Sequence, residues 1–317
     1  MKNIYSNIIK FNSKNLIKII NILKKNGIIG LPTETVYGLA GNAYSNSAIK
    51  KIFKIKKRLK KNPLIIHYYS LSSAKKDVIL DKKFFKIYKK FSPGPITYIV
   101  KKKNNSKIKP LACANLKTVG IRFPKNKITR QILKKLKFPL AMPSANKSTS
   151  ISPVRPKDVS EEFENKIKVV DGGITRIGIE STVLNLVGQI SILRPGIITS
   201  HQIEKILKIK IKFPKNQKVI RSPGALSRHY SPGIPLLLNK KKCPKKYAFI
   251  TFGPNYPVTR NTFCLSKKSN LNEAAKNLYK IFRKIKNRGF KKIYVTKIPN
   301  EGIGYAINDK LKRASKL

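Results

Sequence analysis

Short apolar segments typical of β-strands alternate with segments of helical periodicity along this 317-residue chain, which restricts it to the mixed α/β classes. Residues 13–25 predict a helix capped by Ser13, and an apolar strand follows at 28–31. Residues 183–186 and 190–193 predict a hairpin. Because hairpin and crossover connections occur together, we expect a twisted mixed sheet rather than an all-parallel one.

The same periodicities predict further elements in two groups separated by a proline-rich stretch. In the first group the helices are at 46–56, 81–91, 128–136 and 199–207, and the strands at 64–67, 96–100, 118–123 and 138–142. The second group has strands at 247–252, 262–265 and 292–296, with helices at 271–286 and 303–313. Residues 208–235 contain four prolines and little periodicity, as in a linker. We therefore predict a first domain at 1–207, a linker at 208–235 and a small α/β domain at 236–317.

The charge of the chain is extreme but evenly spread. There are 70 Lys and Arg against 13 Asp and Glu, a formal net charge of +57. Such an excess attracts polyanions, yet lysines occupy nearly every segment, as a compositional bias at tolerant surface positions would place them. A selected nucleic-acid surface is the alternative. The rare acidic residues are more informative where they fall in polar stretches next to predicted strands.

Several classes of protein are disfavoured by composition. Cys113, Cys243 and Cys264 form no Cys-x-x-Cys pair, so neither a disulfide framework nor a zinc site is expected. The apolar segments are far shorter than the ~20 residues that span a bilayer, and residues 1–5 show no signal-peptide pattern. We expect a cytoplasmic protein that does not enter membranes.

Two polar stretches follow or precede predicted strands, where α/β proteins place ligand contacts. The basic loop 54–63 follows a helix C-terminus, where the helix dipole disfavours an anion, so side-chain cations led by Arg58 would have to attract it. A solvated basic loop is the alternative. Residues 32–38 bring two hydroxyls and a carboxylate after a strand; they are either ligand groups or a helix cap at Thr33 with a first-turn acid at Glu34.

Three other stretches are weaker alone. Residues 143–146 and 178–182 carry hydroxyl, amide and carboxylate groups that suit a ligand loop or a plain turn. Arg194 ends a predicted strand and either binds an anion or extends its cation to solvent. His67, taken by itself, is better read as a packed or surface histidine. No nucleophile elbow, zinc-protease helix or phosphate-binding glycine loop occurs, so an enzyme of this sequence would work by holding and polarising its substrates.

Taken in order, these stretches resemble the threonylcarbamoyl-adenylate synthase family of the YrdC-like fold. The resemblance is carried by residues 31–42, 52–67, 92–97, 118–124, 142–153, 171–182 and 193–196. Residues 222–224 and 228–230 resemble the linker of the family's long form, and 301–308 the last helix of its second domain. The resemblance implies an α/β (α+β) architecture: a YrdC-like twisted mixed sheet with helices, plus a small C-terminal Rossmann-like domain.

The resemblance also implies the reaction: L-threonine, bicarbonate and ATP, accompanied by Mg²⁺, give threonylcarbamoyl-AMP and pyrophosphate. The product serves proteins that form threonylcarbamoyladenosine in tRNA, and a weak contact of this chain with RNA stays an open alternative. The implied ATP contacts are Lys56, Arg58, Asn62, Thr118, Ser144, Ser152, Arg194 and Tyr230. The implied threonine contacts are Thr35, His67, Arg122, the backbone of Met142, and Ser181. The implied catalytic cations are Lys56, Arg58 and Arg194, and no tightly bound protein metal is expected.

The chain departs from the family at three positions inside the resembling stretches. Lys57 and Leu59 stand where the family has Gly and Pro, and Thr149 where it has Gly. Since Lys57 and Leu59 lie inside the basic loop, we expect them to change its path. One alternative function is a non-catalytic RNA-binding protein of the same fold, which predicts stacking aromatics near that loop; Tyr68 and Tyr69 are there but alternate in direction. Another is a carbamoyl-phosphate enzyme for metallocentre maturation, which normally carries zinc-binding cysteine modules.

Overall fold

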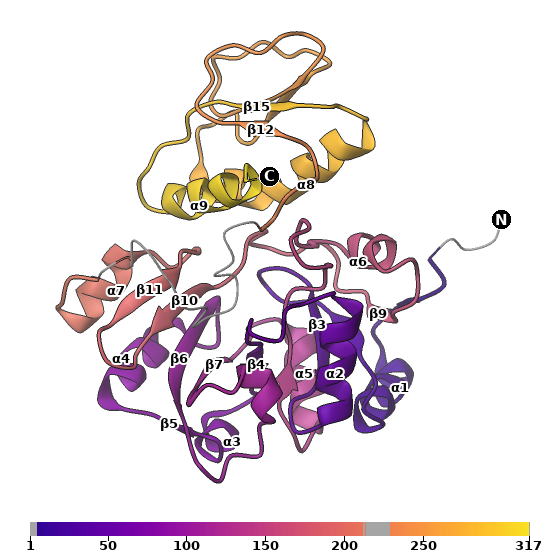
Figure 1. The fold of residues 1–317 in the computed structure, drawn as a ribbon, viewed down its shortest axis with the longest axis vertical. Coiled ribbons are helices and arrows are strands. Elements are labelled where there is room, and N and C mark those ends of the chain that lie inside the picture. The colour runs from indigo at the N-terminus through magenta and orange to yellow at the C-terminus, as the bar shows by residue number, and fades with distance from the viewer. Residues whose placement is uncertain (1–4, 212, 214–228, 317) are drawn as a thin grey trace.

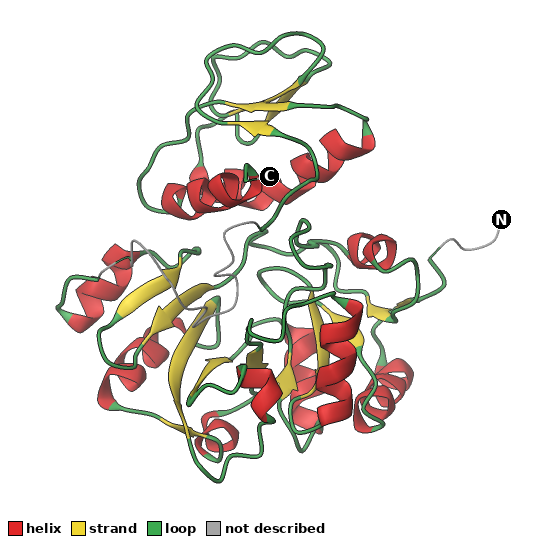
Figure 2. Cartoon of the chain, viewed as in Figure 1, coloured by secondary structure: helices red, strands yellow, loops and turns green. Residues whose placement is uncertain are grey.

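The computed structural model describes residues 5–211, 213 and 229–316 (Figure 1). The predicted linker motif at 222–224 and Arg228 lie outside the described residues. The chain forms a larger α/β body that holds β1 to β11 and a smaller one that holds β12 to β15, as the strands and helices in Figure 2 show.

The larger body is built on an 11-stranded sheet of order β1-β9-β2-β3-β8-β4-β7-β6-β10-β11, with β5 paired to β6. Its strands are β1 (Ile8–Ile9), β2 (Ile29–Leu31), β3 (Gly38–Asn42), β4 (Ile65–His67), β5 (Val78–Ile79), β6 (Ile96–Lys102), β7 (Thr118–Arg122), β8 (Leu140–Ala141), β9 (Val169–Val170), β10 (Thr182–Asn185) and β11 (Ser191–Arg194). β4 and β7 are parallel, while β6 and β7, and β10 and β11, are antiparallel. The prediction of a mixed sheet with a hairpin at its end is confirmed.

Helices cover this sheet, and they are α1 (Ser13–Lys24), α2 (Asn46–Ile55), α3 (Leu71–Lys75), α4 (Lys82–Phe91), α5 (Lys127–Lys135), α6 (Pro156–Glu162) and α7 (Ser200–Leu207), with a 3₁₀ turn at Pro110–Cys113. The longer ones, such as α1, α2, α4 and α5, bury an apolar stripe. The cap of α1 was wrongly predicted: Asn12, not Ser13, accepts the N–H of Asn15. Asn12 has the extended backbone of a cap, which leaves Ser13 as the first helical residue.

The smaller body has a 4-stranded parallel sheet of order β12-β15-β13-β14. Its elements are β12 (Leu236–Leu237), β13 (Ala248–Thr251), β14 (Thr262–Cys264), α8 (Leu271–Asn287), β15 (Ile293–Val295) and α9 (Gly304–Ala314). In Figure 1, α8 and α9 lie between this sheet and the larger body. The parallel sheet and its helices agree with the predicted small α/β domain.

The two bodies share buried apolar surface. One hydrophobic cluster joins Val36, Ile151 and Ile179 of the larger body to side chains of α8 and α9. The contact is close at Gly178, where a Cβ atom would lie 2.6 Å from the Cα of Lys276 in α8, and where φ is +84°. A residue with a side chain does not fit there, so glycine permits the helix to approach. The domain limits at 207 and 235 stay predictions.

No helix within the described residues has the length and apolar content needed to cross a membrane.

Candidate active site

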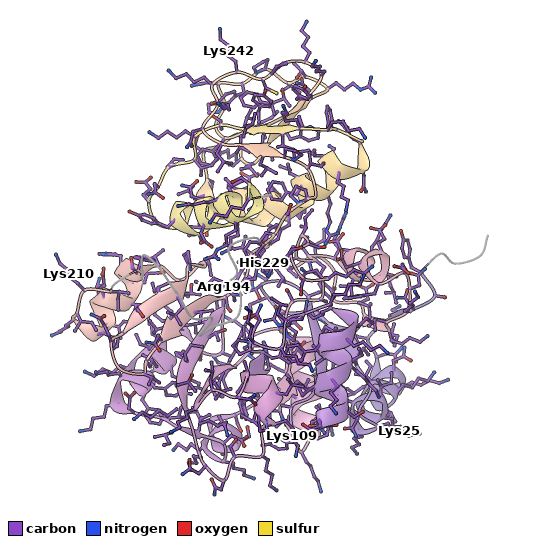
Figure 3. All side chains as sticks on the ribbon, in the orientation of Figure 1. Lys25, Lys109, Arg194, Lys210, His229 and Lys242 are labelled. Carbon is purple, nitrogen blue, oxygen red and sulfur yellow. The ribbon has the colours of Figure 1, made fainter. Side chains whose placement is uncertain are left out.

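One cavity collects residues from strand ends that are far apart in sequence. It encloses about 490 Å³ of space, counting the part that opens to solvent. Most of the predicted site residues line it: Thr35, Arg58, His67, Arg122, Met142, Ser144, Arg194 and Tyr230. Figure 3 shows Arg194 and His229 side by side near the junction of the two bodies, whereas Lys25, Lys109, Lys210 and Lys242 lie at the periphery. The polar stretches that follow separate strands thus converge.

The segment after β2 is an irregular loop and does not begin a helix. Residues 32–37 are irregular and lead into β3, so the interpretation of Thr33 as a cap and Glu34 as a first-turn acid is wrong. Glu34 instead accepts a hydrogen bond of 2.6 Å from Nη2 of Arg122, 88 residues later in the chain. The same Nη2 donates to Oγ1 of Thr35 at 2.9 Å.

This ion pair is buried and fixes the guanidinium of Arg122. The two side chains are only 5% and 8% exposed. Burial would raise the pKa of Glu34, but the charge and hydrogen bond of Arg122 and the backbone N–H of Lys125 lower it below its usual value. Glu34 is therefore ionised at neutral pH. Nε of Arg122 has no partner within the part of the chain that the structure describes, so one donor of the guanidinium has no acceptor there.

His67, at the end of β4, lines the same part of the cavity and is 1% exposed. Burial and the charge of Arg122 lower the pKa of His67 well below its usual value, so the ring is neutral. Nδ1 lies 3.3 Å from the carbonyl oxygen of Ile65, a distance at which one nitrogen donates and the other can accept. The interpretation of His67 as a mere packing residue does not account for its place in the cavity wall.

Two arginines place positive charge in another part of the cavity. Arg58 donates through Nε and Nη2 to the carbonyl and side-chain oxygens of Asn62, and Arg194 donates through Nε and Nη2 to the backbone oxygen of Ser181. Burial and the nearby charge of Arg194 lower the pKa of Arg58 to about 9, which leaves it cationic at neutral pH. Neither arginine pairs with a carboxylate in the described ranges. Their charge is therefore available to an anion.

Lys56 is near this region, but it is not among the residues that line the cavity. It is 1% exposed, and Nζ donates to the backbone oxygens of Ser144 and Asn146. Lys56 thus fastens the loop that carries Ser144 to the C-terminal end of α2. A direct contact with ATP stays a prediction for Lys56.

Other predicted residues support the wall from behind. The side-chain oxygen of Asn62 accepts a hydrogen bond from Arg58. Oγ of Ser181 is hydrogen-bonded to Oγ1 of Thr97 and also accepts from Arg194. Oγ of Ser152 donates to Glu180. Thr118 differs from all of them. It begins β7, whose last residue is Arg122, and its side chain lines a separate groove with Lys101 and Lys117. The geometry lends no support to an ATP contact for Thr118.

Two of the three positions that depart from the family have a left-handed backbone conformation. Lys57 has φ of +48° and Thr149 has φ of +73°, in the left-handed region that glycine favours. The chain therefore keeps a glycine-type conformation with a side chain present at both positions. The possibility that these substitutions redirect the basic loop finds no support, because Arg58 still reaches the cavity.

Sequence reasoning missed three further residues as members of the site. Glu34 holds Arg122; Glu180 lines the cavity and accepts from Ser152 and from Tyr279 of α8; and His229 also lines it. The two glutamates belong to the few acidic residues of the chain and fall in the singled-out stretches, which was a usable signal. Burial, together with Arg58 and Lys56, lowers the pKa of His229 well below its usual value.

Comparison with known proteins agrees with this site. The family model described as "Telomere recombination" matches residues 21–196, and the model "Threonylcarbamoyl-AMP synthase, C-terminal domain" matches 198–316. Threonylcarbamoyl-AMP synthases of Pyrococcus abyssi and Bacillus subtilis are each 32% identical to this chain; the matches cover 92% of both chains for the first, and 93% of this chain and 91% of the relative for the second. The crystal structure of P. abyssi Sua5 complexed with L-threonine superposes with a TM-score of 0.89 at 29% identity, covering 97% of each chain.

Together with these relatives, the YrdC-like sheet and the added C-terminal domain identify an AMP-transferring enzyme. The chain belongs to the threonylcarbamoyl-AMP synthase family.

Proposed function

We propose that this cavity binds L-threonine, bicarbonate and ATP and couples them. In this proposal Arg122 binds threonine, and the pair Arg58 and Arg194 binds ATP. The observation that carries the proposal is that Arg122 and the pair Arg58 and Arg194 line one cavity while being held by different neighbours. The relative from P. abyssi was solved with L-threonine, which supports an amino acid as one ligand.

Threonine would lie at Arg122, with its carboxylate on the guanidinium. Nε of Arg122 is buried and has no partner among the residues that the structure describes, and such a group is costly unless a ligand supplies an acceptor. Thr35, the neutral ring of His67 and the backbone at Met142 would then contact the hydroxyl and the amine. These groups are uncharged and suit a small polar side chain better than an ionic one.

ATP would enter as its magnesium complex, with phosphate oxygens and water as the ligands of the ion. Arg58 and Arg194 would contact the triphosphate, and Ser144 and Tyr230 would line the rest of the nucleotide pocket. The Oη atom of Tyr230 and Nδ1 of His229 are buried and lack partners in the described ranges, which supports a polar ligand beside them.

The chemistry requires orientation more than a covalent nucleophile. The amine of threonine takes up bicarbonate to give a carbamate and water. A carbamate oxygen then attacks the α-phosphorus, and the bond to pyrophosphate breaks. Arg58 and Arg194 would offset the charge that grows on pyrophosphate. Holding three small reactants in line can supply roughly 7–11 kcal/mol of the lowering of the barrier.

The cellular setting is also a proposal. The three cysteines are free, which agrees with the reducing cytoplasm, where proteins that modify tRNA would take up the intermediate. The rival function of RNA binding through stacked bases lacks a platform at the basic loop. Tyr68 is 1% exposed and donates to Asp77, and the guanidinium of Arg130 lies 4.6 Å from the ring centroid of Tyr69.

Pyrophosphate release from ATP tests the proposal when L-threonine, bicarbonate and magnesium are omitted one at a time. We expect release only when all three are present. Arg58→Ala should abolish most of it, whereas Lys60→Ala, an exposed lysine of the same loop, should not. Equal release without threonine would rule the proposal out, and loss of activity in Lys60→Ala as large as in Arg58→Ala would remove Arg58 from the site.

A further inference from the structure

Only two lysines are buried in the described residues of this lysine-rich chain, and both fasten the cavity wall. Lys56 is 1% exposed and Lys310 is 0% exposed. Lys56 donates to backbone oxygens of the Ser144 loop. Lys310, on α9 of the smaller body, donates to the backbone oxygen of Pro195 at 2.7 Å. Burying an ammonium group is costly unless it is paired, so both amines are committed to holding these loops.

The amine of Lys310 touches two segments that carry nucleotide-side residues. Pro195 directly follows Arg194, and Nζ also lies 5.6 Å from the ring centroid of Tyr230, within reach of a cation–π contact. Oδ2 of Asp309 lies 3.6 Å from Nζ. Burial lowers the pKa of Lys310, and the charge of Asp309 opposes this shift. The side chain is therefore a junction between α9, the end of β11 and the linker.

The turn after Arg194 is also packed tightly against β10. A Cβ atom at Gly196 would lie 2.4 Å from the backbone nitrogen of Thr182, so this turn packs directly on β10. The guanidinium of Arg194 is tied to Ser181 in the same place. From the smaller body, Lys310 adds a hydrogen bond to the backbone oxygen of Pro195 in this turn.

The ring of Tyr230 depends on the smaller body as well. Its hydroxyl has no partner in the part of the chain described, so no hydrogen bond from the side chain fixes the ring there. The ring stacks on Tyr279 of α8, with centroids 5.9 Å apart and planes at 29°. Tyr279 in turn donates to Glu180 of the cavity wall at 2.9 Å. Two of the side chains that contact the Tyr230 ring, Tyr279 and Lys310, thus come from α8 and α9, beside the ring of His229, whose centroid lies 4.0 Å from that of Tyr230.

We propose that Lys310 is a positioning residue for ATP, which fixes the Arg194 turn and the Tyr230 ring so that the C-terminal domain completes the nucleotide part of the cavity. This inference rests on the proposed function, because it presumes that Arg194 and Tyr230 face ATP. The contacts of Lys310 that the structure describes reach none of Thr35, His67 or Arg122. Loss of Lys310 therefore acts on ATP and spares threonine.

Steady-state pyrophosphate release by the full chain tests this with Lys310→Met, which replaces the aliphatic part of the side chain and removes the amine. The KM for ATP should rise about ten- to a hundredfold, as expected for a lost charged hydrogen bond, while the KM for threonine stays within twofold. Lys312→Met, an exposed lysine of the same helix, is the matched control and should match the wild type. Thermal unfolding of each variant shows whether it is folded.

Two results would overturn the inference: an unchanged KM for ATP, or equal rises of both KM values, as a merely structural role would give. Should Lys310→Met fail to fold, Lys310→Gln keeps a neutral donor for Pro195 and loses the cation over Tyr230; a smaller but selective rise in the KM for ATP is then expected, and no rise refutes the inference. Calorimetric titration with Mg·ATP alone separates the two proposals. Weaker ATP binding by Lys310→Met would support Lys310 even if threonine-dependent turnover were absent in the wild type.

Discussion

Replacing Arg122 by Met should destabilise the protein strongly, because it isolates a buried carboxylate. Nη2 of Arg122 lies 2.6 Å from Oε1 of Glu34, and the side chains are 5% and 8% exposed. Oε2 keeps the backbone N–H groups of Lys125 and Asn126, but Oε1 loses its charged partner. Removing one member of a buried pair costs about 3–5 kcal/mol. At roughly 2–4 °C per kcal/mol for a body of this size, the Tm should fall by about 6–20 °C.

The loss should depend on pH in a defined direction. In the wild type the folded pKa of Glu34 lies below its unfolded value, so the pair contributes stability at neutral pH that is lost as the pH falls through the lowered pKa. In Arg122→Met the lowering charge is gone and burial raises the pKa of Glu34 instead. A proton then relieves the isolated charge, so the difference from the wild type should be larger at pH 8 than at pH 5.

Urea unfolding at both pH values checks this, with Glu34→Gln in the Arg122→Met background as the control. The neutral amide should recover most of the lost free energy of unfolding, while threonine-dependent pyrophosphate release stays absent because the carboxylate-binding fork is missing. A free energy of unfolding for Arg122→Met within about 1 kcal/mol of the wild type would refute the reasoning, since it would mean that the pair is solvated. No recovery by Gln would refute it too.

Three other perturbations follow from the same structure. Arg194→Ala should lower kcat/KM about 10²–10³-fold with an unchanged Tm; wild-type turnover would place the nucleotide elsewhere. Gly38→Ala should lower the free energy of unfolding by about 1–3 kcal/mol, because its Cβ would lie 2.3 Å from Cγ of Met142; equal urea midpoints would contradict this packing. Thr149→Gly should raise the free energy of unfolding by about 1 kcal/mol, since Thr149 has φ of +73°; a lower urea midpoint would mean that the threonine side chain contributes more than the backbone strain takes away.

The main elements could be predicted because their periodicity is strong. α4 and α8, for example, were found within two residues of their ends. β3 was missed because Gly38, Leu39, Ala40 and Gly41 carry no alternation and little strand propensity. That strand exists because it pairs with β2 and β8, and because Met142 packs where a side chain at Gly38 would stand.

The residues that line the cavity could be predicted better than the role of each residue. Arg58 and Arg194 could be singled out because each precedes or ends a strand and strand ends meet in space, whereas Arg122 is implied only by the family resemblance. A sequence cannot distinguish a residue that touches a ligand from one that holds such a residue. The sequence therefore predicts ligand contacts for Ser181 and Lys56 but not that Ser181 accepts from Arg194 or that Lys56 donates to the Ser144 loop.

Contacts between the two bodies were beyond sequence reasoning. Nothing in the periodicity of α9 distinguishes Lys310 from the other lysines of the chain, because its role depends on Pro195, 115 residues earlier. Glu180 and Tyr279 are 99 residues apart and meet in the same way. Such pairs form only when the smaller body packs on the larger one. This packing requires close contacts such as that between Gly178 and α8.

The central claim is that one cavity takes threonine at Arg122 and the triphosphate at Arg58 and Arg194. A crystal structure of this protein with L-threonine and a non-hydrolysable ATP analogue tests it most directly. We predict the threonine carboxylate on the guanidinium of Arg122, and phosphate oxygens within hydrogen-bonding distance of both Arg58 and Arg194. A nucleotide bound outside this cavity, or a threonine carboxylate on Arg58 or Arg194, would contradict the account.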